Sequence, residues 1–240
     1  MGYTASGANH GLETVTSDGK INSVTDYDGN EYPVVQIGSQ CWLAENLRTR
    51  RYSDGTAITP GGSSTSATTA YYYDYSSSNI PLADRGYLYN WPAVMRNSSS
   101  SSVTPSGVQG ICPSGWHVPS DAEWTQLTDY VSGQSEYVCG GNTSYIAKAL
   151  ASKTYWNTSS GTCYVGDTPS ANNATGFGAL PAGAYLNHGY SYFGNDAYFW
   201  SATEASSGND WYRYLHYYIA GVTRNSNGKN NGYSVRCLRD

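Results

Sequence analysis

The sequence predicts one α+β domain, in which helices in the middle of the chain precede an antiparallel sheet. Two local patterns carry this prediction, a capped helix at residues 121–131 and an alternation typical of a strand at residues 211–220. Size is the third observation, because 240 residues can bury roughly 70–75% of the surface of the unfolded chain, which is enough for one good core.

The N-terminal part of the chain predicts a linker followed by a hairpin-like opening. Residues 1–25 are polar and without periodicity, so we expect a linker there and the domain at residues 26–240. Residues 26–30 have a turn composition, and the β-branched stretch 32–38 predicts a strand. For residues 40–48 a short helix and a strand both remain open.

Two helices are expected in the middle of the chain. Ser120 and Glu123 form the S-x-x-E pattern of a capping box. The apolar stripe that follows consists of Trp124, Leu127 and Val131. A second, shorter helix is expected at residues 143–151, where apolar residues recur at helical spacing. These residues are Tyr145, Ile146, Ala149 and Leu150.

The rest of the chain is expected to consist of loops and short strands. Residues 60–79 and 97–106 are rich in Ser, Gly and Thr and predict surface loops. In residues 211–220 every second side chain shares a face of the strand, so Leu215 and Ile219 should point inward. The opposite face should lie in water and carries Tyr212, Tyr214, His216 and Tyr218.

Composition and charge exclude several classes of partner. Charged residues make up 13% of the chain, against about 25% in a typical domain, and 24 Tyr stand beside 3 Phe. The polar groups of the surface are therefore expected to be mainly hydroxyls and amides.

The net charge is −5, and the largest cluster of basic residues consists of Arg48, Arg50 and Arg51. This charge pattern disfavours binding to nucleic acid. No apolar run is long enough to span a bilayer, so a soluble chain is expected.

The cysteines favour disulfides over a metal site. Cys41, Cys112, Cys139, Cys163 and Cys237 show no C-x-x-C pair and no His at metal-ligand spacing. Disulfides indicate an oxidising compartment or an extracellular life. We expect Cys139 to pair with Cys163, because that bridge closes the stretch that contains the second helix. Since five is odd, one thiol must be free or must pair between molecules.

Seven motifs occur in order along residues 26–240. They are Asp28-Gly-Asn-Glu-Tyr32, Trp42-x-x-Glu-Asn-Leu47, Tyr87-x-Tyr-Asn-Trp91, Ile111-Cys-Pro-x-Gly-Trp-His-Val-Pro-Ser-Asp-x-Glu-Trp124, Gly176-Phe-x-Ala-Leu-Pro-Ala-Gly183, Phe199-Trp-Ser-Ala-Thr-Glu204 and Tyr233-Ser-Val-Arg-Cys237. Together they resemble the Fibrobacter succinogenes major paralogous domain, which is common on bacterial surfaces. That family is similar in fold to C-type lectin-like and formylglycine-generating-enzyme-like domains. The resemblance implies two helices packed on a twisted antiparallel sheet with long loops that display a ligand surface.

The resemblance also has implications for the remaining cysteines and for metals. A lectin-like scaffold implies that Cys112 pairs with Cys237 and leaves Cys41 free, with Cys41 as an alternative for either partner. The Glu-Pro-Asn or Gln-Pro-Asp triplet that true C-type lectins use for calcium is absent. We therefore expect no required metal and no cofactor.

Residues 182–228 resemble the segment that diversity-generating retroelements diversify in related lectin-fold proteins. Adenine-directed mutagenesis there yields codons that cannot encode Lys, Glu, Gln, Met or Trp. Of these types the segment contains only Trp200, Glu204 and Trp211, whereas Tyr, Asn, Ser and Gly are abundant. Such a composition resembles that of a paratope, where Tyr supplies rigid contact area and small polar residues supply hydrogen bonds.

The sequence thus predicts a non-enzymatic receptor-recognition protein with an exposed and hypervariable surface. Its partner would be a protein or glycan on a cell surface, and the protein itself would be extracellular, on a bacterial surface or a phage virion. The predicted ligand-binding residues are Tyr185, Asn187, His188, Tyr190, Tyr192, Asn195, Asp196, Tyr198, Asn209, Asp210, Tyr212, Tyr214, His216 and Tyr218. Five tryptophans should hold these loops rigid: Trp42, Trp91, Trp116, Trp124 and Trp200.

Two alternatives remain, an invariant surface adhesin or lipoprotein domain and a formylglycine-generating-type enzyme. The enzyme would need a reduced, reactive cysteine pair near His117, which disulfides would remove. No catalytic triad is recognisable, so we assign His117 a structural role. Glu204 is expected to anchor loop amides or an arginine.

Overall fold

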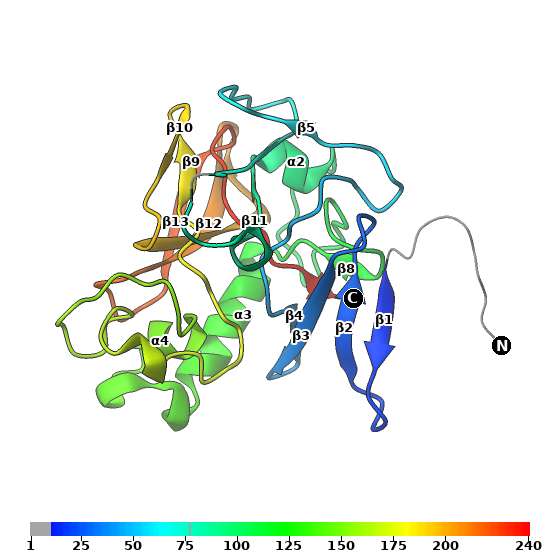
Figure 1. Ribbon diagram of the computed structural model, residues 1–240. Helices are drawn as coiled ribbons and strands as arrows, with labels where there is room; N and C mark the ends of the chain where they lie inside the picture. Colours follow the sequence, from blue (N-terminus) through cyan, green and yellow to red (C-terminus); the bar gives the residue numbers. More distant parts are fainter. Residues whose placement is uncertain (1–10, 77) are drawn as a thin grey trace.

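The computed structural model describes residues 11–76 and 78–240 (Figure 1). Most of its regular structure is antiparallel sheet, with few and short helices. The largest sheet has the strand order β1-β2-β3-β4-β14-β8. Its strands are β1 (Leu12–Val15), β2 (Ile21–Thr25), β3 (Glu31–Ile37), β4 (Gln40–Leu43), β14 (Leu238–Arg239) and β8 (Trp116–His117). The last strand of the chain therefore pairs directly with one of the first four.

Three smaller sheets complete the β-structure of the described residues. A long antiparallel meander consists of β11 (Asp196–Ser206), β12 (Asn209–His216) and β13 (Thr223–Gly228). A hairpin beside it consists of β9 (Ala184–Leu186) and β10 (Gly189–Ser191). The third sheet consists of β5 (Thr59–Pro60), β6 (Tyr71–Tyr73) and β7 (Leu88–Tyr89), in which β5 is parallel to β6.

The predicted helix at residues 121–131 is confirmed as α3 (Asp121–Ser132). The Ser120 hydroxyl accepts from the Glu123 amide over 3.2 Å, and the Glu123 carboxylate accepts from the Ser120 amide over 2.8 Å. This reciprocal capping satisfies two amides that a helix start would otherwise leave unpaired. Figure 1 shows α3 running through the middle of the molecule, where it packs against β3, β11 and β12.

The second predicted helix, at residues 143–151, is reduced to the single turn α4 (Ala147–Leu150). The Ala147 amide donates instead to the carbonyl of Ala220, a tertiary partner at 2.9 Å, which draws the chain out of a longer helix. Tyr145 lies before α4 and is 39% exposed. The other short helices are α1 (Leu82–Arg85), α2 (Trp91–Met95) and the 3₁₀ turns Ser135–Tyr137, Cys139–Gly141 and Pro169–Ala171.

The predicted linker at residues 1–25 does not hold for its second part, which forms β1 and β2. Strand β2 pairs with β3 and buries Val24 completely. Strand β1 is the edge of the sheet and exposes most of its side chains, so its sequence is polar enough to resemble a linker. Residues 1–10 lie outside the described residues.

The core is built around aromatic residues, and the five tryptophans that were expected to hold the loops rigid are all buried. The side chain of Arg236 lies within this core and is almost completely buried. Its guanidinium donates to the carbonyls of Leu43, Phe177 and Gly178 and to the side chain of Asn46. Burial lowers the pKa of Arg236 to about 9. Residues 40–48, left open by the sequence, begin as the strand β4.

Both expected disulfides are present. Cys112 is bonded to Cys237, and Cys139 is bonded to Cys163. The first ties the segment before β8 to the segment before β14, and the second closes the loop that contains α4. Cys41 is free.

Candidate functional site

Strand β12 lies at the centre of the predicted display region, and its two faces have different neighbours. The odd-numbered side chains point toward α3. Arg213 donates to the Asp121 carboxylate over 2.6 Å, and Leu215 is buried as the alternation predicts. The even-numbered face, which the alternation places in water, is covered over part of its length.

The tyrosines at the covered end are buried, so their predicted exposure is wrong. Tyr212 is 6% exposed, and Tyr198 on β11 is 9% exposed. The C-terminal segment covers them, because the Tyr233 ring lies 4.8 Å from that of Tyr198 and 5.0 Å from that of Tyr212. Tyr185 is buried too and stacks on Tyr73 at 3.9 Å. Burial raises the pKa of Tyr212 to about 12.

Asn209 and Asp210 lie at the far end of β12 from His216, about 20 Å away at the usual rise of a strand. The predicted exposure of Asp210 is also wrong. Its side chain is 0% exposed, and neither carboxyl oxygen has a hydrogen-bond partner among the described residues. Burial raises the pKa of Asp210 to about 8. The nearby Lys229 opposes this shift and Glu204 adds to it.

The hairpin β9-β10 carries a separate group of predicted residues. Asn187 and His188 form its turn and are exposed. The Nδ1 atom of His188 lies 2.8 Å from the carbonyl oxygen of Ser63, and the Tyr190 hydroxyl donates to the carbonyl of Asp74 over 2.9 Å. These residues contact the loops around β6, away from the open part of β12.

The opposite end of the β12 face is open. Tyr192, in the turn after β10, is 49% exposed, and Tyr218, just beyond β12, is 50% exposed. Backbone bonds join the two segments. The Asn195 amide donates to the Tyr192 carbonyl over 3.0 Å, and the Tyr217 amide donates to the Asn195 carbonyl over 2.9 Å. We use the term open end for Tyr192, Asn195, Tyr214, His216 and Tyr218. The predicted exposure of His216 is wrong, because its side chain is only 14% exposed.

A buried carboxylate holds the side chain of His216 in place. Asp196 is 3% exposed, so its predicted exposure is wrong. Its oxygens accept from the Tyr198 hydroxyl and lie against Nδ1 of His216. Burial and the bond to Asp196 raise the pKa of Tyr198 far above its ordinary value. The His216 ring in turn packs edge-on against the Tyr218 ring at 3.9 Å. Asp196 therefore orients the imidazole, and the imidazole orients Tyr218.

His117 has a structural setting, as assigned. Its Nε2 atom lies 2.8 Å from a Glu123 oxygen, and its Nδ1 atom lies 2.6 Å from an Asp240 oxygen. Burial lowers the pKa of His117, but the two carboxylates outweigh it and the net shift is upward. A ring that faces a carboxylate from each nitrogen serves best as a donor to both, that is, as an imidazolium.

Glu204 forms an ion pair with Lys229, where an arginine or loop amides were the expected partners. The Lys229 ammonium also lies 4.5 Å from the ring centre of Trp91. The carboxylate thus tethers the segment after β13 to β11.

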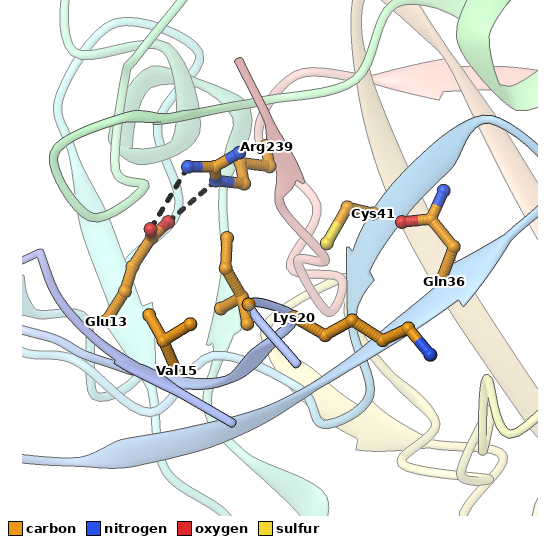
Figure 2. A pocket seen from close by; sticks show the side chains of 8 residues that line it. Glu13, Val15, Lys20, Gln36, Cys41 and Arg239 are labelled. Atoms are coloured by element: carbon orange, nitrogen blue, oxygen red, sulfur yellow. Dashed lines mark hydrogen bonds and ion pairs between the residues drawn. The ribbon is translucent and has the colours of Figure 1, made fainter. Parts of the chain in front are cut away.

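The free thiol of Cys41 lines a pocket of about 530 Å³ between residues of β1, β2, β3, β4 and β14. Figure 2 shows Cys41 beside Gln36, with Glu13 bonded to Arg239 across the pocket. Burial raises the pKa of Cys41. The thiolate, which is the nucleophilic form, is therefore disfavoured at this site.

The described residues contain no group of three or more His, Cys, Asp or Glu side chains that could hold a metal ion. In the same part of the chain, no helix has the length and apolar character needed to cross a membrane.

A family model described as the Fibrobacter succinogenes major domain matches residues 35–239. The chain belongs to this family. Seven motifs in the chain had indicated the same family, and the matched region covers the six-stranded sheet from β3 onward, α3 and the open end. Comparison of the chain with curated proteins and with solved structures found no match.

Sequence reasoning missed the residues that surround Tyr218. Tyr217 falls on the inward face by alternation but is partly exposed, since β12 ends at His216. Tyr145 fits the apolar stripe of a longer helix, yet it lies near Tyr218 at the surface. No local signal could have found this group, because its members come from three separate segments of the chain.

Proposed function

We propose that this domain is a non-enzymatic recognition protein that holds its partner at the open end. The single observation that carries the proposal is the pair of half-exposed tyrosines, Tyr192 and Tyr218, at the end of the closely packed β11-β12-β13 sheet. Half-exposed tyrosines that are already oriented offer a large contact area at low entropic cost. The scaffold we propose is C-type lectin-like.

The interior contacts support this proposal. Asp196 orients His216, and His216 packs against Tyr218, so a binding partner would not have to order that ring. Four of the five cysteines are in disulfides, and a formylglycine-type reaction would need a reduced pair. The disulfides are also consistent with an oxidising environment, and we propose a location outside the cell, on a bacterial surface or a virion.

We further propose that residues 182–228 are diversified by a retroelement. The buried positions Tyr185, Tyr198 and Tyr212 would then tolerate few replacements, whereas Tyr192 and Tyr218 would vary freely. This predicts an adenine-rich near-copy of the coding stretch beside a reverse transcriptase gene. A coding region without such a copy would instead favour an invariant adhesin.

Binding of the labelled domain to a panel of intact bacterial cells, followed by flow cytometry, tests the recognition function. The double variant Tyr192→Ser, Tyr218→Ser should lose binding to any cell that the unaltered domain binds. The matched control is Tyr130→Ser, Tyr155→Ser, which alters two tyrosines that are each 39% exposed elsewhere. Equal binding by both double variants, or no binding to any cell, would reject the proposal.

A further inference from the structure

Two neighbouring clefts share Tyr218 as a lining residue. The first has a volume of about 500 Å³ and is lined by Thr158, Ser159, Ser160, Tyr217 and Tyr218. The second has a volume of about 250 Å³ and is lined by Ser144, Tyr145, Tyr164, Tyr218, Ile219, Ala220 and Gly221. Tyr218 is therefore a shared wall that a longer ligand would straddle.

The lining side chains define the chemistry of a ligand. They carry four tyrosine rings and the hydroxyls of serines and a threonine, and none of them is charged. A charged group placed here would lose hydration without an opposite charge to compensate. Ring faces favour flat apolar surfaces, and hydroxyls favour a rim of donors and acceptors. A neutral sugar ring presents both, with C–H groups on its face and hydroxyls around its edge.

The walls of both clefts are held in place by backbone bonds. The Gly166 amide donates to the Tyr217 carbonyl over 2.7 Å, and the Ile219 amide donates to the His216 carbonyl over 3.0 Å. The disulfide of Cys163 fastens the segment that carries Tyr164. The Tyr218 ring is itself packed against His216 and Tyr217. Because these walls are already ordered, binding would cost little conformational entropy. A low entropic cost favours a small ligand that makes few contacts.

We infer that the two clefts beside Tyr218 bind a neutral oligosaccharide, with one sugar unit in each cleft. The inference rests on the proposed function, since it names the chemical class of partner at the same end of the molecule. A protein partner is less well matched. The centres of protein interfaces favour Trp and Arg anchors together with Tyr, and neither Trp nor Arg lines either cleft. Tyr145 and Tyr164 are then specificity residues that lie outside residues 182–228, and they act together with Tyr217 and Tyr218 from within that segment.

The test uses isothermal titration with neutral pentasaccharides of glucose, mannose, galactose, xylose and N-acetylglucosamine, each offered separately. At least one should bind the domain with a dissociation constant below about 1 mM. Tyr218→Ala should weaken that binding by about tenfold or more through loss of the shared ring, whereas Tyr218→Phe should change it by less than about threefold. Tyr145→Ala should weaken it as well. The control is Tyr130→Ala, which alters a tyrosine of the same exposure as Tyr145 and should leave binding unchanged.

Two titration results would overturn the inference. They are the absence of binding by every probe at about 10 mM and equal binding by Tyr218→Ala and Tyr130→Ala. Thermal melting of each variant separates a binding defect from unfolding. Cell binding that depends on Tyr218 but survives periodate oxidation of the cell-surface sugars would indicate a protein partner. That result would overturn the oligosaccharide inference and leave the proposed recognition function standing.

Discussion

Replacing Asp210 by Asn is expected to stabilise the domain at neutral pH. The Asp210 carboxyl is completely buried, has no hydrogen-bond donor among the described residues, and has its pKa raised to about 8 by burial. The folded protein therefore holds a proton at pH 7 that the unfolded chain has released. Taking up that proton at pH 7 costs folding free energy. Asn has nearly the same shape as a protonated Asp and never carries a charge, so Asp210→Asn removes this cost.

The size of the effect follows from the two pKa values. Between pH 3.8, the ordinary pKa of an Asp side chain, and pH 7, the unaltered domain loses about 1.4 kcal/mol of its free energy of unfolding per pH unit through Asp210. The stabilisation by Asn therefore has an upper limit of roughly 4 kcal/mol at pH 7. Because the Asn amide brings its own unpaired donors into the buried site, we expect a net gain of about 2–4 kcal/mol. For a domain of this size that corresponds to a melting temperature about 5–15 °C higher.

The sign of the pH dependence makes the prediction specific. Since the folded pKa of Asp210 is raised, the unaltered domain should lose stability as pH rises from about 4 to about 8 and then level off. Thermal melting of the domain and of Asp210→Asn across this range should show a gap that is absent near pH 4 and largest near pH 8. Asp129→Asn, on the exposed face of α3, is the control and should change stability by less than about 0.5 kcal/mol at any pH. A gap that is absent at pH 7, or that does not close toward pH 4, would show that the Asp210 carboxyl is ionised in the folded protein.

Three further measurements test the arrangement around the site. Tyr212→Ser should lower the free energy of unfolding by about 3–4 kcal/mol in urea titrations, whereas Tyr218→Ser should lower it by less than about 1 kcal/mol. Similar losses would contradict the division of that face into a buried part and an open end. Replacing both Cys139 and Cys163 by Ser should cost about 3 kcal/mol by loop closure, and an unchanged melting temperature would argue that the bridge does not form. The pKa of His117 is higher in the folded protein than its ordinary value of 6.5. Its contribution to the free energy of unfolding is therefore fully present below pH 6.5 and is lost as the pH rises through the pKa of the folded state. The urea midpoints of the domain and of His117→Gln should therefore differ at about pH 5.5 and converge at about pH 9, and a gap that stays constant would refute the charged state of His117.

Local patterns were sufficient wherever the interaction partners are near in sequence. Ser120 and Glu123 are three residues apart, so their mutual capping predicted the start of α3. The Cys139–Cys163 bridge was also found, because it closes a short loop. In contrast, the helix at residues 143–151 was overpredicted, since a tertiary bond to Ala220 competes with helix formation there.

The alternation of β12 predicted which residues share a face but not which face meets solvent. Both faces are covered over part of their length, one by α3 and the other by the segment around Tyr233, which lies 17 residues after the end of β12. Side chains alternate between the two faces of a strand whatever covers each face, so the alternation does not show where a face is covered. Tyr212 and Tyr218 therefore look equivalent in sequence, although only Tyr218 is open to a partner.

By itself the amino-acid sequence determined the family, the long helix and the Cys139–Cys163 disulfide, because each depends on short motifs or on residues that are near one another in the chain. The family resemblance implied the Cys112–Cys237 disulfide but left Cys41 as an alternative partner, and the structure decided between them. Only the tertiary structure decided that residues 12–25 belong to the sheet and that Asp196, Asp210 and Tyr212 are buried. It alone brought residues 144–145, 158–164 and 217–221 together around one ring. The physical reason is that burial is a property of neighbours, and these neighbours come from segments that are distant along the chain.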